Sequence, residues 1–394
     1  MSAGGAQRAG TSGASACADC LRRSWLLGQL SAVLDRNCRA DGRLFELLAL
    51  GDEQLIAALG GRRRERLRRE HASALADAPP LPGAACGAVC VHDPGYPMAL
   101  REAARGLAAP RLLHVAGGPG RMHELAARPA VALLGTPRPS AYGLKLGRRL
   151  GRELAASGVV VVTQCVAGVA FAAQQGTLDA GGAALLVAGD GLRVPPPRSR
   201  REVYDALLSD GCAVSELPLD SHGRAWGAAA SVRIAVGLSA LVLLVEAREE
   251  PRDLRGAELA RLAGRAVAAL PGRADSADSA GCHALLRDGA RLVRGSEDVL
   301  DLLYGADAGA RREAPARPER PWLSELQQEL VARIGEGIDT IDGLAGAGRD
   351  RGETLQALTE LELSGTLVRV DRGRYAVASP QRHVRYGDPA QMES

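Results

Sequence analysis

Two loops in the central part of the chain have the residue types that bind phosphate. The apolar run 131–134 is followed by a loop that contains Gly135, Thr136 and Ser140, and a second apolar run is followed by a loop that contains Gly168. Each loop leads into a segment of helical pattern. Backbone N–H groups and hydroxyls at such a strand–helix junction suit an anion. Two such loops in succession predict a ligand that carries phosphate.

The elements that must position these loops are short β-branched runs that alternate with helical segments. Continuous apolar runs of this kind are typical of parallel strands that are buried on both faces. Right-handed crossovers would join them into one doubly wound, Rossmann-like α/β sheet, in which ligands bind beyond the carboxyl ends of the strands. We expect strands at 131–134, 159–162, 184–188, 212–215, 240–246 and 266–270.

Changes of pattern divide the chain into seven regions. Leucines at helical spacing mark a first group of short helices, and a passage rich in Pro and Gly follows it. A stretch without periodic apolar residues reads as a linker. After it, three helices and a tight hairpin have the order of a winged helix. The predicted regions are a disordered tail 1–16, a helical (SAM-like) domain 17–78, a connecting segment 79–129, a Rossmann-like domain 130–304, a linker 305–321, a winged helix 322–379 and a tail 380–394.

The predicted winged helix is acidic. Between residues 322 and 379 it has six arginines and ten acidic residues, a formal charge of −4, and Glu353, Glu360 and Glu362 lie on the helix that would enter a major groove. A helix that reads DNA needs cations beside the phosphates. We therefore expect this region to serve protein contacts or dimer regulation; the alternative is a small module that only packs on the main domain.

The overall composition restricts the function very little. The chain has 394 residues and a net charge of +3, which is too small to imply a partner. Lys145 is its only lysine, so nearly all of its basic residues are arginines, and a single arginine is weak evidence for function. The segment 62–70 contains six arginines and two glutamates, which fits either a nucleic-acid contact or, as we favour, a solvated helix face. No apolar run reaches the roughly 18 residues that span a bilayer. The first residues lack the apolar core of a signal peptide. We expect a cytoplasmic protein with reduced thiols and no membrane partner.

Cysteines and histidines raise the question of metal. Cys17 and Cys20 have the spacing of half a zinc site, and Cys86 and Cys90 with His92 could supply the other half. The two groups are far apart in the sequence, and neither has the context of a zinc ribbon. We therefore favour buried or surface thiols and predict no metal and no cofactor; zinc at Cys17 and Cys20 stays open as the alternative.

The chain lacks the residue patterns of the catalytic sites that we considered. Its seven histidines are scattered without metal-ligand spacing, and it has no Gly-x-x-x-x-Gly-Lys-Ser/Thr loop. Pro271-Gly272 continues as Arg273-Ala274, whereas related nucleotide hydrolases have a Pro-Gly-Gly-x-Gly-Thr run. We expect no enzyme activity. A nucleotide sensor remains an alternative, because a mononucleotide also offers phosphate.

In the order and spacing of several short motifs the chain resembles the DNA-processing protein A family, known as DprA or Smf. The similarity spans residues 17–379, and no single motif carries it. The matching stretches are 92–97, Gly135-Thr136, 140–143, Ser215-Glu216 with Pro218, 233–239, 245–247, Pro271-Gly272, Gly281-Cys282 and 285–290.

The resemblance implies a function in DNA uptake. Members of this family bind and protect single-stranded DNA without sequence preference and load the RecA recombinase during natural transformation, and they commonly form homodimers. Loop amides and a few cations can hold phosphates while the bases go unread. By this resemblance the DNA-binding residues are Gly135, Thr136, Arg138, Ser140, Gly168, Gly189, Gly191 and Arg233.

Several positions depart from the family pattern in the same region. Pro137 and Ala167 stand where the family has arginine, Gln174 stands for a histidine, and Ser231 opens the stretch that is Arg-Asn-Arg in the family. Pro137 removes a cation and an amide donor, although Arg138 can reach the same phosphate from the next position. Two interpretations stay open. Either the remaining groups still bind a strand, or the chain is a diverged scaffold or nucleotide sensor that has lost strong DNA binding.

Overall fold

The structure is a computed structural model that describes residues 16–40, 43–74, 86–104, 106–305, 324–335, 338, 340–345, 350–363, 366–370 and 374–377. The chain forms two compact units, residues 1–315 and 316–394, and each is described by itself. The predicted tails 1–16 and 380–394, apart from Ala16, and the predicted linker, apart from Gly305, lie outside the described residues. No helix among the described residues is long and apolar enough to cross a membrane.

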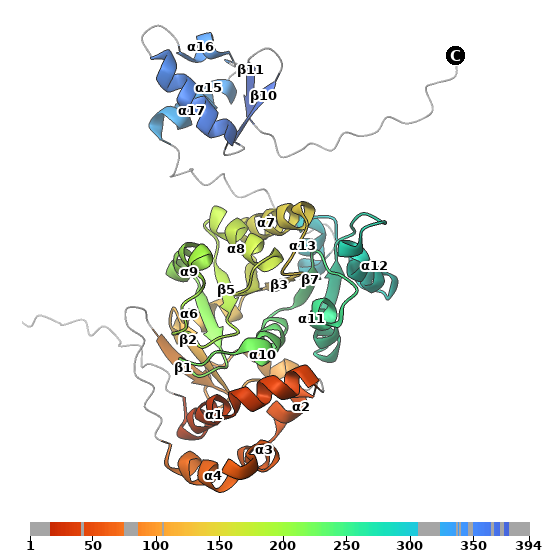
Figure 1. The fold of residues 1–394 in the computed structure, drawn as a ribbon. Coiled ribbons are helices and arrows are strands. Elements are labelled where there is room, and N and C mark those ends of the chain that lie inside the picture. Colours follow the sequence, from red (N-terminus) through yellow and green to blue (C-terminus); the bar gives the residue numbers. More distant parts are fainter. Residues whose placement is uncertain are drawn as a thin grey trace, which may run out of the picture. The chain divides into compact units, whose positions relative to one another are not determined.

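A nine-stranded sheet forms the centre of the first unit (Figure 1). The strand order is β1-β2-β6-β5-β4-β3-β7-β8-β9. The strands from β6 to β9 are parallel, and β1 and β2 add an antiparallel pair beside β6. The strand bounds are β1 Cys86–Cys90, β2 Leu112–Ala116, β3 Ala130–Leu134, β4 Val160–Gln164, β5 Ala184–Val187, β6 Cys212–Ser215, β7 Leu241–Leu244, β8 Ala266–Ala269 and β9 Arg291–Leu292.

Helices cover both faces of this sheet, which confirms the predicted doubly wound Rossmann-like fold. Alternate residues along each strand point to opposite faces, so Val131 packs with Leu150 of α7 while Ala132 packs with Val236 of α10. One face carries α7 Ala141–Ala156, α8 Val169–Asp179, α9 Arg198–Asp210 and α13 Ser296–Tyr304. The other carries α5 Met98–Ala103, α6 Pro119–Ala126, α10 Arg224–Gly237, α11 Pro251–Leu262 and α12 Ala280–Arg287.

A group of N-terminal helices packs against α10 and is part of the same unit (Figure 1). Its elements are α1 Ala18–Ala40, α2 Leu44–Ala49, α3 Asp52–Leu59, the 3₁₀ helix η1 Gly61–Arg63 and α4 Arg64–Ser73. Leu26, Leu30 and Leu34 recur at helical spacing on α1 and are buried with Trp226 of α10. The helices predicted for 17–78 are thus present, and they share a core with the sheet domain.

The predicted connecting segment belongs to the sheet. It contains β1, β2, α5 and α6, and the pairing of His114 with Ser215 joins β2 to the parallel strands. The sheet domain therefore begins well before residue 130. Three strands have no counterpart in the predicted set: β1, β2 and the two-residue β9.

The described residues of the second unit form three helices followed by an antiparallel hairpin, in the order predicted for a winged helix. Their bounds are α15 Glu325–Gly335, α16 Ile341–Ala345, α17 Arg351–Leu363, β10 Leu367–Val370 and β11 Arg374–Val377. Leu330, Leu344 and Leu358 form the centre of its small core. Residues 371–373, which join the two hairpin strands, lie outside the described residues.

Candidate nucleic-acid interface

The two predicted phosphate loops lie at the carboxyl edge of the parallel sheet. The strand order reverses between β3 and β7, because the chain passes from β3 through β4, β5 and β6 on one side and returns to β7 on the other. Such a switch point is where doubly wound folds usually bind a ligand. The loops that diverge there are the one from Gly135 to Ser140 and the one that begins at Val245.

A protein carboxylate occupies the helix terminus at this switch point. Glu246 is almost fully buried, and its Oε1 accepts a hydrogen bond from Ser140 Oγ at 2.6 Å. Its Oε2 accepts one from the backbone N–H of Ser140 at 2.8 Å. Ser140 Oγ in turn accepts from the N–H of Gly143 and caps α7. Ser140, a predicted phosphate contact, therefore already makes hydrogen bonds within the protein. A phosphate at the N-terminus of α7 would be repelled by the Glu246 carboxylate.

The loops after β3 and β4 pack directly on each other. Gly168 has φ +84°, which favours glycine, and an added Cβ would lie 2.4 Å from Thr136 O. The N–H of Val169 donates to the same carbonyl at 3.3 Å. Thr136 is 2% exposed, and its N–H donates to Glu246 O at 2.8 Å. Gly135, Thr136 and Gly168 are thus brought together as predicted, in positions that fix the shape of the loops.

Gly189 and Gly191 follow β5 and lie against protein backbone. An added Cβ on Gly189 would lie 3.2 Å from the backbone of Gly227, so the loop after β5 fits closely against α10. The N–H of Gly191 donates to Ser221 O at 2.8 Å. These contacts give both glycines a packing role.

Arg138 is the predicted cation that faces solvent. Its N–H donates to Thr136 Oγ1 at 3.3 Å, which fixes the backbone. The side chain is exposed, and its guanidinium makes no hydrogen bond or ion pair with residues in the described part of the chain. The Arg138 guanidinium is therefore available to contact a phosphate at the solvent-exposed edge of the loops after β3, β4 and β5, called the rim below.

Arg233 does not face solvent, and its predicted phosphate contact is wrong for this structure. It lies in the third turn of α10 with 1% exposure, and Nη2 forms a buried ion pair with Glu216. Nη1 donates to Ala108 O, and the guanidinium lies over the ring of Phe45 at 5.4 Å. The side chain thus joins the N-terminal helices, the segment before β2 and the loop after β6.

Three arginines that the sequence analysis did not single out lie at the start of α9, and one of them contacts the loop after β4. Arg198, Arg200 and Arg201 begin α9, and Arg200 Nη1 donates to Cys165 O at 3.2 Å in the loop after β4. The side chains of Arg198 and Arg201 are exposed and unpaired among the described residues. Their signal in the sequence was a cluster of arginines directly after three prolines, at the start of a helix that follows a strand.

Tyr142 adds an aromatic surface to this rim. It lies in the first turn of α7, and its side chain is about half exposed while its hydroxyl donates to Pro271 O at 3.0 Å. A ring held in this way can stack on a base. Gln174, where the family resemblance implied a histidine, is buried instead and donates to Thr163 Oγ1 and Gln164 O.

The arginine-rich segment 62–70 behaves mostly as a solvated helix face. Arg66 pairs with Glu70, and Arg68 pairs with Glu53 and Glu65. Arg63 and Arg64 donate to main-chain carbonyls. These local partners use four of its six cations.

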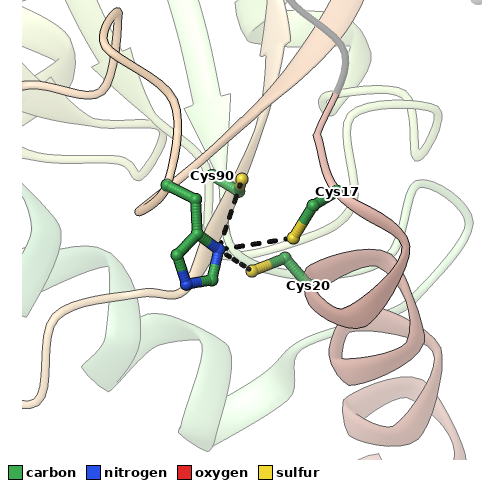
Figure 2. Close-up of side chains that lie close together, drawn as sticks. Cys17, Cys20 and Cys90 are labelled. Carbon is green, nitrogen blue, oxygen red and sulfur yellow. Dashed lines mark hydrogen bonds between the residues drawn. The ribbon is translucent and has the colours of Figure 1, made fainter.

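A second cluster lies away from these loops, where α1 meets β1. Cys17, Cys20, Cys90 and His92 each direct one ligand atom to a common centre, and these atoms all lie within 4.8 Å of one another (Figure 2). The fold thus brings together residues that lie more than 70 positions apart in the sequence. Cys86 begins β1, and its side chain lies outside the described residues.

The surroundings of this cluster shift the pKa values of Cys17 and Cys20 in opposite directions. Burial alone would raise the pKa of Cys17, but the backbone N–H of Cys20 and the ring of His92 lower it to about 7. Burial, together with the neighbouring sulfurs, raises the pKa of Cys20 to about 12. The thiolate form is thus favoured more at Cys17 than at Cys20.

Comparison with known proteins agrees with the fold and the motifs. Residues 87–304 match the family model of DNA recombination-mediator protein A. The chain is 34% identical to Protein Smf of Escherichia coli K12 over 276 residues, which covers 68% of this chain and 72% of that protein. It is 31% identical over 262 residues to the putative DNA processing protein DprA of Mycobacterium tuberculosis, with 66% and 67% covered.

A solved structure supports the same conclusion at the level of the fold. DNA processing protein A from Streptococcus pneumoniae superposes with a TM-score of 0.57 at 24% identity, over 73% of this chain and 98% of that one. The family model covers more than half of the 394 residues, and the resemblance first drawn from the short motifs is confirmed. The chain belongs to the DNA recombination-mediator protein A family.

Proposed function

We propose that this protein binds single-stranded DNA through the rim of the loops after β3, β4 and β5. The observation that carries the proposal is the exposed and unpaired group of Arg138, Arg198 and Arg201 at the carboxyl edge of the sheet. Membership of the family supports DNA as the ligand. Cations at a rim hold a sugar–phosphate backbone without reading the bases.

The buried carboxylates favour a strand over a nucleotide. Glu246 fills the helix terminus where a mononucleotide would place its phosphate, whereas a strand can run along the exposed arginines and stack a base on Tyr142. The proposal is therefore binding without catalysis. It extends to a cytoplasmic homodimer that protects incoming strands and passes them to RecA during transformation.

The direct test is the salt dependence of binding to a labelled oligothymidylate. The triple change Arg138→Ala, Arg198→Ala and Arg201→Ala should weaken binding at least tenfold at low salt, and each lost phosphate contact should lower the salt slope by about one unit. Arg62→Ala is the matched control, because Arg62 is also exposed but lies on the N-terminal helices. An unchanged affinity and slope in the triple variant would reject this interface.

A gain of function tests the same surface from the opposite direction. Ala167 is exposed in the loop after β4, where the family resemblance implied an arginine. Ala167→Arg should tighten binding and steepen the salt slope, and Ala167→Gln controls for side-chain size. Equal affinities for the two variants would place the strand elsewhere. RecA transfer is tested separately, by the RecA ATPase rate on strands that this protein has already covered.

A further inference from the structure

The cluster between α1 and β1 has the dimensions of a filled zinc site. His92 Nδ1 lies 3.3 Å from Cys17 Sγ, 3.5 Å from Cys20 Sγ and 4.0 Å from Cys90 Sγ (Figure 2). Tetrahedral zinc, with bonds of about 2.3 Å to sulfur and 2.0 Å to nitrogen, holds a sulfur and a nitrogen about 3.5 Å apart. The ion would fit between the four ligand atoms with small side-chain adjustments.

Hydrogen bonding alone does not account for this convergence. The Nδ1 atom of a neutral imidazole either donates one proton or accepts one, yet three sulfurs face it. Cys20 and Cys90 are 0% and 2% exposed, so water cannot satisfy them as it could at the surface. A cation at the centre gives all four groups the same partner.

We propose that Cys17, Cys20, Cys90 and His92 bind one structural zinc ion. Three thiolates and an imidazole form a donor set that is typical of closed structural zinc sites, and four protein ligands leave no open position for a substrate. The Cys-x-x-Cys pair lies at the start of α1, with Cys17 directly before the helix and Cys20 in its first turn.

The ion would act as a cross-link between the helical region and the sheet. Two ligands come from the start of α1, and the other two come from the end of β1, which is an edge strand. The apolar cluster at this junction is small, with Ala16 and Leu112 beside the two buried cysteines. A metal bond therefore holds α1 where little apolar surface can do so.

Metal content of the full chain is the first test. The protein is expressed with a removable tag that lacks histidines and is purified without chelator, and its zinc is measured by plasma mass spectrometry. We expect about one zinc per chain. Cys20→Ser and His92→Ala should each lose most of it. Cys38→Ser is the matched control and should keep it, because Cys38 is a half-buried thiol on the same helix outside the cluster.

Cobalt provides a readout that does not depend on how well the variants fold. Replacement of the metal in the wild-type chain by Co²⁺ should give the visible bands of tetrahedral cobalt and the near-ultraviolet charge transfer of thiolate ligands. Chelation should lower the Tm by several degrees, and added zinc should restore it. A wild-type chain with less than about a tenth of an equivalent of zinc and no such bands, or one with a Cys17–Cys20 disulfide in reducing cytosol, would overturn the proposal.

Discussion

Replacement of Arg233 by methionine should destabilise the first unit strongly and leave strand binding unchanged. The side chains of Arg233 and Glu216 are 1% and 6% exposed, so Arg233→Met leaves a buried carboxylate without its cation. Removal of one partner of a buried ion pair costs about 3–5 kcal/mol. Loss of the contact with the Phe45 ring adds roughly 0.5–2 kcal/mol. Nε of Arg233 has no hydrogen-bond partner among the described residues, so its burial costs free energy in the wild-type protein. Methionine removes this cost, which offsets part of the loss.

The expected loss is therefore about 3–5 kcal/mol in the free energy of unfolding, a large part of the usual 5–15 kcal/mol. Urea unfolding followed by tryptophan fluorescence measures it. Trp226 is fully buried in the first unit, and a Trp322→Phe background removes the signal from the second unit. The double variant Arg233→Met with Glu216→Leu should recover most of the loss, because no uncompensated charge stays buried.

A different result would contradict the buried position of Arg233. If Arg233→Met changed the free energy of unfolding by less than about 1 kcal/mol and lowered the salt slope of strand binding by about one unit, Arg233 would be a phosphate contact. Our assignment of the side chain to the core would then be wrong. The family-based expectation from the sequence would be restored.

Three further changes test other parts of the structure. Gly168→Ala should lower the free energy of unfolding by at least about 2–3 kcal/mol, because the added Cβ would clash with Thr136 O. Gly158 also has a positive φ, +77°, but open space around it, so Gly158→Ala should cost only about 1 kcal/mol. Urea titrations of the two variants measure the difference. Burial and the nearby Arg193 lower the pKa of His114 to about 4, compared with about 6.5 in the unfolded chain. The free energy of unfolding should therefore fall by roughly 3 kcal/mol as the pH drops from 6.5 to 4. His114→Gln should flatten this pH dependence. Deletion of residues 321–394 should change strand affinity by no more than about twofold, or roughly 0.4 kcal/mol; a tenfold loss in a folded chain would include the second unit in the DNA site.

The sequence predicted strands well where burial alone determines them. The run 212–215 is a strand over its whole predicted length, and the predicted hairpin is present in the second unit. The segment Leu112–Ala116 was missed because His114 interrupts its apolar pattern, although Ser24 Oγ hydrogen-bonds the ring inside the protein. The strand Arg291–Leu292 has two exposed residues and leaves no apolar signal.

Side-chain partners distant in sequence were the part that could not be predicted. Arg233 was named from the family resemblance, but it lies nine residues after the start of α10 at Arg224, on a buried face of the helix. The four zinc ligands are separated by the whole helical region. Two local signals were present: Cys17 and Cys20 have the spacing of half a zinc site, and His92 follows Cys90 in the turn directly after β1.

The positions of two carboxylates argue against the nucleotide-sensor alternative. Glu216 follows β6 and Glu246 follows β7, both at the carboxyl edge of the sheet, and each is directed to donors of the protein itself. A nucleotide that entered the switch point would have to displace Glu246 from the Ser140 N–H and leave a buried charge without partners, which costs several kcal/mol. A strand at the rim displaces neither carboxylate. The switch point that binds dinucleotides in other proteins of this fold is therefore occupied here by the Glu246 side chain. In the proposed function, phosphate contacts come from the exposed arginines and weaken with salt.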